Sequence, residues 1–191
     1  MIVGFWGVPI NVQSVLTNPM DTDVSTRDTI QRMIQIAKVS SQSPKVIEIL
    51  DSLIRDLPRN PTQTDLARKV YWWIKNHVKF EEDESILANQ LGYADPNQEL
   101  LIPADTLLSM PQPMGDCDDF SMLAASFMVA AKIPVWFVAV AVDETEPWRF
   151  SHVYCAVLVD NAVVPFDASH GSHLGWETKR HVFRREEWLV N

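Results

Sequence analysis

Cysteine is scarce in this sequence, which contains only Cys117 and Cys155. The two thiols could in principle form one disulfide. The first residues, Met1 to Gly7, lack the basic segment and the long apolar segment of a secretory signal peptide. We therefore expect no export by a signal peptide, and two free thiols in a reducing compartment.

Long apolar runs and excess positive charge are also missing. The longest apolar candidate, residues 133–142, is broken at Asp143, well short of the roughly 18 residues of a membrane-spanning helix. The net charge of -9 argues against a general nucleic-acid binder and against adhesion to anionic lipid. We expect neither nucleic acid nor membrane as a partner. One cluster of basic residues is present, and we interpret it as a solvent-exposed face of a terminal helix or loop: Lys179, Arg180, Arg184 and Arg185.

Apolar residues are abundant enough for a real core, since 47% of the 191 residues are hydrophobic and 21% are charged. The length suits one domain with an N-terminal extension. We predict an apolar arm over residues 1–20 and one domain over residues 21–191, with a helical part over 21–132 and a sheet part over 133–191. The arm could add an edge strand or dock on a partner, and its pattern favours neither.

Helical spacing of apolar residues recurs in the first half of the chain and predicts helices over 26–39, 46–54 and 64–77. Residues 89–113 have no clear period and carry several prolines. A loop of this length begins to suggest function. It leads directly into a glycine-containing turn.

This turn delivers Cys117 to the start of a helix predicted over residues 116–132. Asp116 is a good N-cap residue, and Asp119 follows it three places later. The pair therefore resembles a capping box. Cys117 is therefore predicted in the first turn of the helix. Free backbone N–H groups and the helix dipole favour a thiolate at that position.

After this helix the pattern changes to strands over 135–142, 150–159 and 162–167. Alternation within the second strand puts His152 and Cys155 on opposite faces, so Cys155 is predicted to be a core residue. Pairing the strands around an Asp160-Asn161 turn brings His152 and Asp167 together as cross-strand neighbours.

A cysteine, a histidine and an aspartate in this arrangement are the groups that a cysteine hydrolase needs. A thiolate from Cys117 would attack a carbonyl carbon, His152 would remove and return the proton, and Asp167 would fix the tautomer of the imidazole. Carboxylates beside the thiol oppose its ionisation. The mechanism therefore requires that Asp118 and Asp119 point toward solvent.

Three segments together resemble the Cys…His…Asp signature of the transglutaminase-like superfamily: residues 115–121 (Gly-Asp-Cys-Asp-Asp-Phe-Ser), 151–154 (Ser-His-Val-Tyr) and 165–168 (Pro-Phe-Asp-Ala). The matched region covers about residues 64–167, more than half the chain. The resemblance implies an α+β, papain-like fold, with N-terminal helices and a central cysteine-bearing helix packed on an antiparallel sheet.

The resemblance also implies that Cys117 is the nucleophile, His152 the base and Asp167 its orienting partner. Family members often place a tyrosine or tryptophan as an oxyanion donor where this sequence has Phe80, which has no donor. Losing one such donor typically lowers the rate by ~100- to 1000-fold.

The predicted function is that of a protease or peptide amidase working by thiol acyl transfer, with cross-linking as a weaker option and no cofactor or metal. The expected partner is a protein or peptide substrate. The version beginning Gly-Asp-Cys-Asp-Asp is similar to transglutaminase-like proteins encoded near phage structural genes. This leaves open a second reading, an inactive structural or assembly component of a phage-like particle, in contact with other particle proteins. The location would then be cytoplasmic or virion-associated.

A metal site is the chemical alternative. Four residues near the C-terminus offer zinc-type ligands: Asp167, His170, His173 and His181. Three aspartates near the predicted nucleophile, Asp116, Asp118 and Asp119, do not form a calcium loop, because the glycine at the sharp turn and the distal glutamate are missing.

Overall fold

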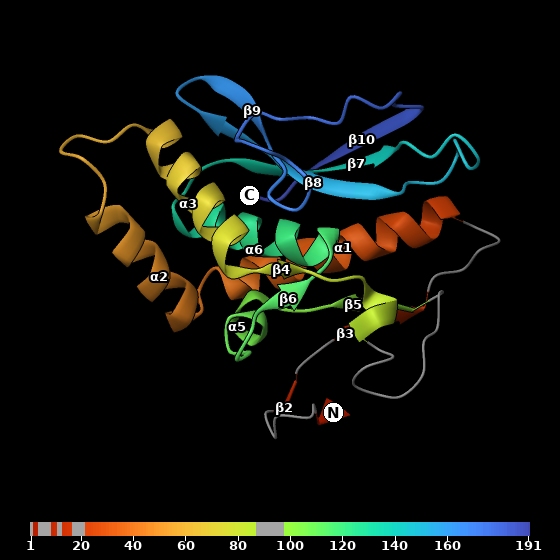
Figure 1. The fold of residues 1–191 in the computed structure, drawn as a ribbon, viewed down its shortest axis with the longest axis horizontal. Helices are drawn as coiled ribbons and strands as arrows, with labels where there is room; N and C mark the ends of the chain where they lie inside the picture. The colour runs from red at the N-terminus through yellow and green to blue at the C-terminus, as the bar shows by residue number, and fades with distance from the viewer. Residues whose placement is uncertain (1, 4–8, 11–12, 17–21, 87–97) are drawn as a thin grey trace.

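The computed structural model (Figure 1) describes residues 2–3, 9–10, 13–16, 22–86 and 98–191. Much of the predicted arm, and residues 89–97 of the predicted irregular segment, lie outside the described residues. Within them, residues 13–16 pair antiparallel with residues 98–101. A strand in the first 16 residues is therefore paired with a segment from the middle of the chain.

The helices are α1 (Thr22–Ser40), α2 (Pro44–Arg55), α3 (Gln63–His77), α5 (Ala104–Leu107) and α6 (Cys117–Ala130). Four of them follow the helices predicted from the sequence. Their ends have local causes. A capping box formed by Thr62 and Asp65 begins α3, and Pro44 occupies the first turn of α2, where its missing N–H costs nothing.

The strands are β1 (Ile2–Val3), β2 (Pro9–Ile10), β3 (Gln13–Leu16), β4 (Lys79–Phe80), β5 (Gln98–Leu101), β6 (Met114–Gly115), β7 (Val135–Ala141), β8 (His152–Val159), β9 (Ala162–Phe166) and β10 (Arg184–Leu189). Four of them form an antiparallel sheet in the order β10-β7-β8-β9. The other strands pair two by two: β1 with β2, β3 with β5, and β4 with β6.

The cysteine-bearing helix α6 lies at the centre of the molecule (Figure 1), with the sheet on one side and α1 on the other. Residues 118–128 of α6 are all buried. A helix that is buried all round must be apolar or small on every face, and Ala124, Ala125 and Ser126 allow close packing. Helix α6 therefore holds its first residue in a fixed position relative to the sheet.

The β8–β9 hairpin turns at Asp160 and Asn161, which have φ angles of 49° and 64°. Two positive φ values in succession are what a two-residue hairpin of the favoured twist requires, and asparagine and aspartate tolerate them. The Asp160 carboxylate also accepts hydrogen bonds from the backbone N–H groups of Gln63 and Thr64 at the start of α3. The predicted turn is confirmed, and it joins the sheet to a helix.

Strand β10 lies within the predicted sheet part but is not one of the predicted strands, because the sequence from Arg184 to Leu189 is mostly charged. It is an edge strand beside β7, where one face can stay exposed. Arg184 donates to Asp23 of α1 at 2.7 Å and pairs with Glu186 at 3.1 Å. Backbone hydrogen bonds to β7 and ion pairs of Arg184 therefore stabilise this strand, although its sequence has no alternation of apolar residues.

The predicted architecture is confirmed: the protein is an α+β fold in which N-terminal helices and a central cysteine-bearing helix pack on an antiparallel sheet. This is the arrangement that the resemblance to the transglutaminase-like superfamily implies. Among the described residues, no helix is long and apolar enough to cross a membrane.

Candidate active site

Cys117 is the first residue of α6, as the sequence predicts, and its side chain is partly buried. Asp116 is the N-cap, with an extended backbone, and its carboxylate accepts a hydrogen bond from the backbone N–H of Asp118 at 3.2 Å. The thiol thus lies where the N–H groups of a helix start favour negative charge.

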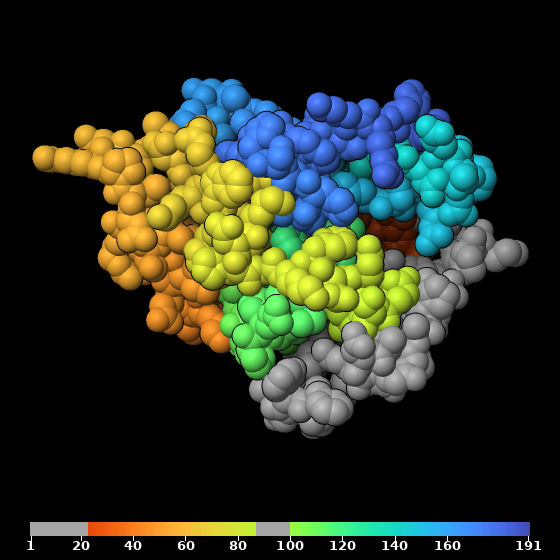
Figure 2. Space-filling view, viewed as in Figure 1, coloured from red at the N-terminus to blue at the C-terminus, as the bar shows by residue number. Residues whose placement is uncertain are grey.

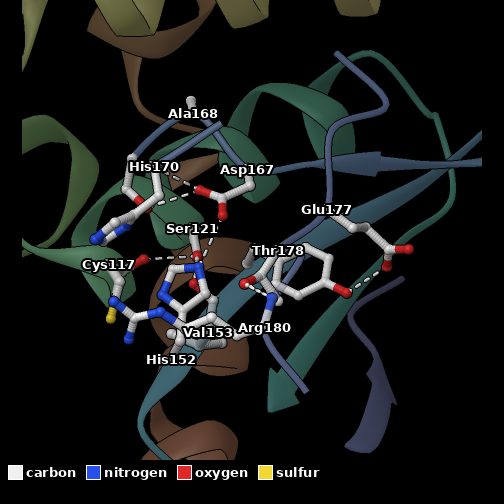
Figure 3. Close-up of polar contacts among 12 residues, drawn as sticks. Cys117, Ser121, His152, Val153, Asp167, Ala168, His170, Glu177, Thr178 and Arg180 are labelled. Atoms are coloured by element: carbon white, nitrogen blue, oxygen red, sulfur yellow. Dashed lines mark hydrogen bonds and ion pairs between the residues drawn. The ribbon is translucent and has the colours of Figure 1, made fainter. Parts of the chain in front are cut away.

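A buried hydroxyl connects the first turn of α6 to β8. Ser121 Oγ lies 2.6 Å from the carbonyl oxygen of Cys117 and 3.2 Å from the carbonyl oxygen of Val153, and it can donate to either (Figure 3). Val153 is the neighbour of His152 on β8. The backbone of the cysteine and the backbone beside the histidine are therefore held together by one side chain.

His152 and Asp167 form a hydrogen-bonded pair, with His152 Nε2 2.8 Å from Asp167 Oδ2. Strand register accounts for it, because β8 and β9 pair Cys155 with Phe166 and so bring His152 level with the residues just after β9. The cross-strand neighbours predicted from the sequence are thus brought together. Asp167 is only 2% exposed.

The environment of Asp167 keeps its carboxylate charged. Burial by itself would raise the pKa of Asp167, but the hydrogen bond and charge of His152 outweigh it, helped by Ser169 and by the backbone N–H of His170, and the pKa falls to about 2. An ionised carboxylate only accepts hydrogen bonds, so the shared proton belongs to His152 Nε2. The other ring nitrogen, Nδ1, then carries the lone pair that a base needs. In the view of Figure 3, Nδ1 faces the side on which Cys117 lies.

His170 packs directly on this pair. Its ring lies edge-on to the His152 ring, with centroids 4.8 Å apart, and its Nδ1 is 3.0 Å from Ser169 Oγ. Burial first, and then the charge of His152, lower the pKa of His170. The sequence interpretation assigned His170 to a metal alternative and missed this place. Its position three residues after Asp167, in the same turn, is the sequence feature that could have placed His170 in the site.

Phe80 lies inside the site. Parallel pairing of β4 with β6 sets Phe80 beside Gly115, at the turn before Cys117. Its ring packs edge-on to His170 at 5.0 Å between centroids, and also contacts Phe120. The position from which the family often offers a donor is therefore filled by an apolar ring.

Arg180 brings a positive charge to the exposed side of the site. In Figure 3 its side chain extends from the segment before β10 toward Cys117. Its charge is among the lesser influences that lower the pKa of His170, after burial and the charge of His152. The space-filling view of Figure 2 shows a small green area, in the colour of the start of α6, between the blue C-terminal part of the chain and the yellow to yellow-green residues of α3 and β4.

Cys155 is a core residue, as predicted. It is fully buried, burial raises the pKa of its thiol, and Sγ donates to the carbonyl oxygen of Ser121 at 3.2 Å. Burial favours the neutral thiol, which is a poor nucleophile. Neither cysteine forms a disulfide, so no disulfide blocks Cys117.

The expectation that Asp118 and Asp119 point toward solvent is wrong. Asp118 is 5% exposed and Asp119 is fully buried. The reason is the central position of α6, which is covered on every side from its first turn onward. Alternation along a helix could not show this, because the covering residues come from distant parts of the chain.

The predicted zinc-type set does not assemble. Asp167 and His170 do lie within 4.8 Å of a third possible ligand, but that ligand is His152. Within the described residues, no such group includes His173, which bonds Ser172, or His181, which packs on Phe183. The residues that could hold a metal here are His152, Asp167 and His170, so the group includes the histidine–aspartate pair itself.

No protein-family model matches this chain, and no curated protein matches it. Among solved structures, it is similar to one described as a TGase, with 16% identity and a TM-score of 0.47, over 85% of this chain and 40% of that one. It is also similar to a Cytophaga hutchinsonii protein with the provisional name of cysteine protease, with 13% identity and a TM-score of 0.46, over 93% of this chain and 57% of that one. The chain thus spans 40% and 57% of the lengths of these two proteins.

Proposed function

We propose that this protein is a transglutaminase-like cysteine hydrolase of papain-like type, a protease or peptide amidase that uses Cys117, His152 and Asp167. The observation that carries the proposal is the 2.8 Å bond between His152 Nε2 and a buried, ionised Asp167, which leaves the lone pair of Nδ1 for a proton from Cys117. A helix start beside an imidazole is where an activated thiol is expected.

The chemistry follows from these groups. His152 Nδ1 takes the thiol proton, and the Cys117 sulfur attacks the carbonyl carbon of an amide. The C–N bond breaks, His152 returns the proton to the leaving amine, and a thioester remains on Cys117. Water then attacks the thioester, His152 takes a proton from it, and the products are a carboxylic acid and the free thiol. Asp167 keeps Nε2 protonated and stabilises the imidazolium while it exists.

A protein or peptide is the proposed substrate, because a thiol with a histidine–aspartate pair is suited to cleaving an amide bond. An amine in place of water would give a cross-link, which needs a site that excludes water. The net charge of -9 supports neither nucleic acid nor an anionic membrane as a partner.

Phe80 is the one observation that favours a second candidate function. It presents an apolar ring to His170 where the family often has an oxyanion donor. A family member without that donor could serve as an inactive structural or assembly component of a phage-like particle, with other particle proteins as partners. The hydrogen bond between His152 and Asp167 is the argument against this alternative, since a purely structural role does not need an ionised carboxylate beside an imidazole.

Hydrolysis of fluorescently labelled casein by the purified chain tests the choice between the two. We expect hydrolysis by the wild type, none by Cys117→Ala, and wild-type rates from Cys155→Ala when all three proteins have the same far-UV circular dichroism. Retained hydrolysis in Cys117→Ala would remove Cys117 as the nucleophile. A folded wild type with no hydrolysis of casein or of a peptide library would favour the structural role.

A further inference from the structure

The loop that follows β9 wraps around the Asp167 carboxylate. The backbone N–H of His170 donates to Asp167 Oδ1 at 2.9 Å, and Ser169 Oγ donates to the same oxygen at 2.8 Å. The backbone N–H of Gly171 donates to the carbonyl oxygen of Asp167 at 3.0 Å. These bonds hold the His170 side chain beside the histidine–aspartate pair.

The same hydrogen bonds determine which nitrogen of His170 carries the proton. The Asp167 carboxylate is ionised and only accepts hydrogen bonds, so the single hydrogen of the Ser169 hydroxyl points to Asp167 Oδ1. Ser169 Oγ can then only accept from His170 Nδ1, which lies 3.0 Å away. A neutral His170 ring is therefore protonated on Nδ1 and has a lone pair on Nε2.

The Asp167 carboxylate thus sets the tautomers of two imidazoles. Its Oδ2 accepts from His152 Nε2, and its Oδ1 accepts from Ser169, which in turn accepts from His170. His152 keeps a lone pair on Nδ1, and His170 keeps one on Nε2. Proton transfer from Cys117 requires only the first of these lone pairs.

The positions of the two rings suit a shared water molecule. Their centroids are 4.8 Å apart, and a nitrogen of His152 lies within 4.8 Å of a nitrogen of His170. Two hydrogen bonds of about 2.9 Å from one water span up to roughly 6 Å, so a single water can donate to both rings. His170 is exposed, and in Figure 3 its ring lies on the side of the site where Cys117 lies. Among the hydrogen bonds between described residues, none reaches His170 Nε2.

We propose that His170 binds the water that hydrolyses the acyl-enzyme, by accepting a hydrogen bond at Nε2. This inference rests on the proposed function, in which a thioester forms on Cys117. The water oxygen forms a bond to the thioester carbonyl carbon while His152 Nδ1 takes one of its hydrogens. The C–S bond breaks, and His152 returns that proton to the sulfur. The other hydrogen is bonded to His170 Nε2 during the attack and stays on the carboxylic acid product.

Hydrolysis of p-nitrophenyl acetate in a stopped-flow instrument separates the two steps. The burst of p-nitrophenol reports acetylation of Cys117, which mass spectrometry of the acid-quenched protein confirms, and the steady state reports hydrolysis of the acetyl-enzyme. His170→Asn is the matched variant, because its amide N–H can still donate to Ser169 while nothing replaces Nε2. We expect a wild-type burst and a steady-state rate about tenfold lower, as for the loss of one hydrogen bond. His170→Gln, whose longer side chain brings an amide oxygen toward the position of Nε2, should recover part of the loss.

His173→Asn is the control. His173 is also exposed and also bonds the serine before it, with Nδ1 2.9 Å from Ser172 Oγ. Among the described residues, however, it is not in the group of possible ligands around Asp167. Its burst and its steady-state rate should both equal those of the wild type.

The outcomes separate this inference from the proposed function. A wild-type steady-state rate in His170→Asn would overturn the inference and leave Cys117 as the nucleophile. Equal losses in the burst rate and the steady-state rate would also overturn it, because a merely structural role of His170 affects both steps. No acetylation of Cys117 in the wild type would remove the proposed function, and the inference with it.

Discussion

The pKa values of two buried carboxyl groups near Cys117 are shifted in opposite directions. That of Asp167 is lowered and that of Asp119 is raised. Both are almost inaccessible to water, with exposed fractions of 2% and 0%. Burial raises the pKa of each. At Asp167 the hydrogen bond and charge of His152, with two further donors, reverse this effect and leave the pKa at about 2.

Asp119 accepts backbone hydrogen bonds from Ile102 and Asp116, but burial and the neighbouring carboxylates Asp116 and Asp83 outweigh them, so its pKa stays raised. Donors and charges around a buried acid, and not burial alone, therefore decide whether it is ionised. Asp167 has a hydrogen-bonding partner in His152. Among the ion pairs of the described residues, none joins a lysine or arginine to Asp119.

Removing the charge on the Asp167 side should have the largest effect. Asp167→Asn keeps the size of the side chain but favours the wrong tautomer of His152, and a loss of about 10⁴-fold in kcat is expected for such a change. Casein hydrolysis by Asp167→Asn measures it, with the exposed Asp143→Asn as the control. Less than a tenfold loss would show that the pair does not serve catalysis.

Two glycines, one on each side, sharpen the comparison. A Cβ on Gly171 would clash with the backbone carbonyl of Asp167, whereas a Cβ on Gly115 would clash with the side chain of Asp119. Backbone atoms shift less readily than a side chain does, so Gly171→Ala should lower the free energy of unfolding by about 3 kcal/mol and Gly115→Ala by about 1 kcal/mol.

Urea unfolding of both variants provides the measurement. The reverse order of costs would show that the Asp119 side chain is held as firmly as the backbone.

Acid should weaken the Asp167 side. The folded pKa is depressed from 3.8 to about 2, so this group stabilises the fold above its unfolded pKa and loses that contribution as the pH falls through about 2. A difference of about 1.8 at 1.36 kcal/mol for each pKa unit gives about 2.4 kcal/mol. Urea unfolding between pH 5 and pH 2 should show this loss in the wild type and not in Asp167→Asn. Equal losses in both proteins would contradict the assignment.

The smallest effect is expected at Ser121, which connects the two sides. Ser121→Ala removes the hydroxyl shared by the carbonyls of Cys117 and Val153 and should cost about 1 kcal/mol. Ser126 is the matched control, because its hydroxyl bonds only Met122 within α6. Chemical unfolding should show Ser126→Ala to be the less destabilised variant. A smaller cost for Ser121→Ala would mean that the contact with β8 adds nothing.

Local patterns in the sequence predicted much of the candidate site. The N-cap at Asp116 and the helix after it put Cys117 in the first turn, and the hairpin at Asp160 and Asn161 fixed the register that brings His152 to Asp167. Each of these depends on residues close together in the chain. The spacing of apolar residues and the identity of the turn residues are enough to predict them.

Long-range packing could not be predicted in this way. The approach of Asp83 to Asp119, and the burial of Asp118, depend on segments that the chain brings together only in the folded state. Strand β10 also escaped prediction, because pairing with β7 and the ion pair of Arg184 with Asp23 stabilise a segment that has no apolar alternation.

The rate at which iodoacetamide alkylates each cysteine, measured by mass spectrometry at pH 8 and at pH 6, tests the central claim most directly. An ordinary thiol with a pKa near 8.5 reacts roughly 100-fold more slowly at pH 6 than at pH 8. Cys117 should react much faster than the buried Cys155, and its rate should fall by less than tenfold between pH 8 and pH 6. Slow alkylation of Cys117, with the pH dependence of an ordinary thiol, would contradict its role as an activated nucleophile.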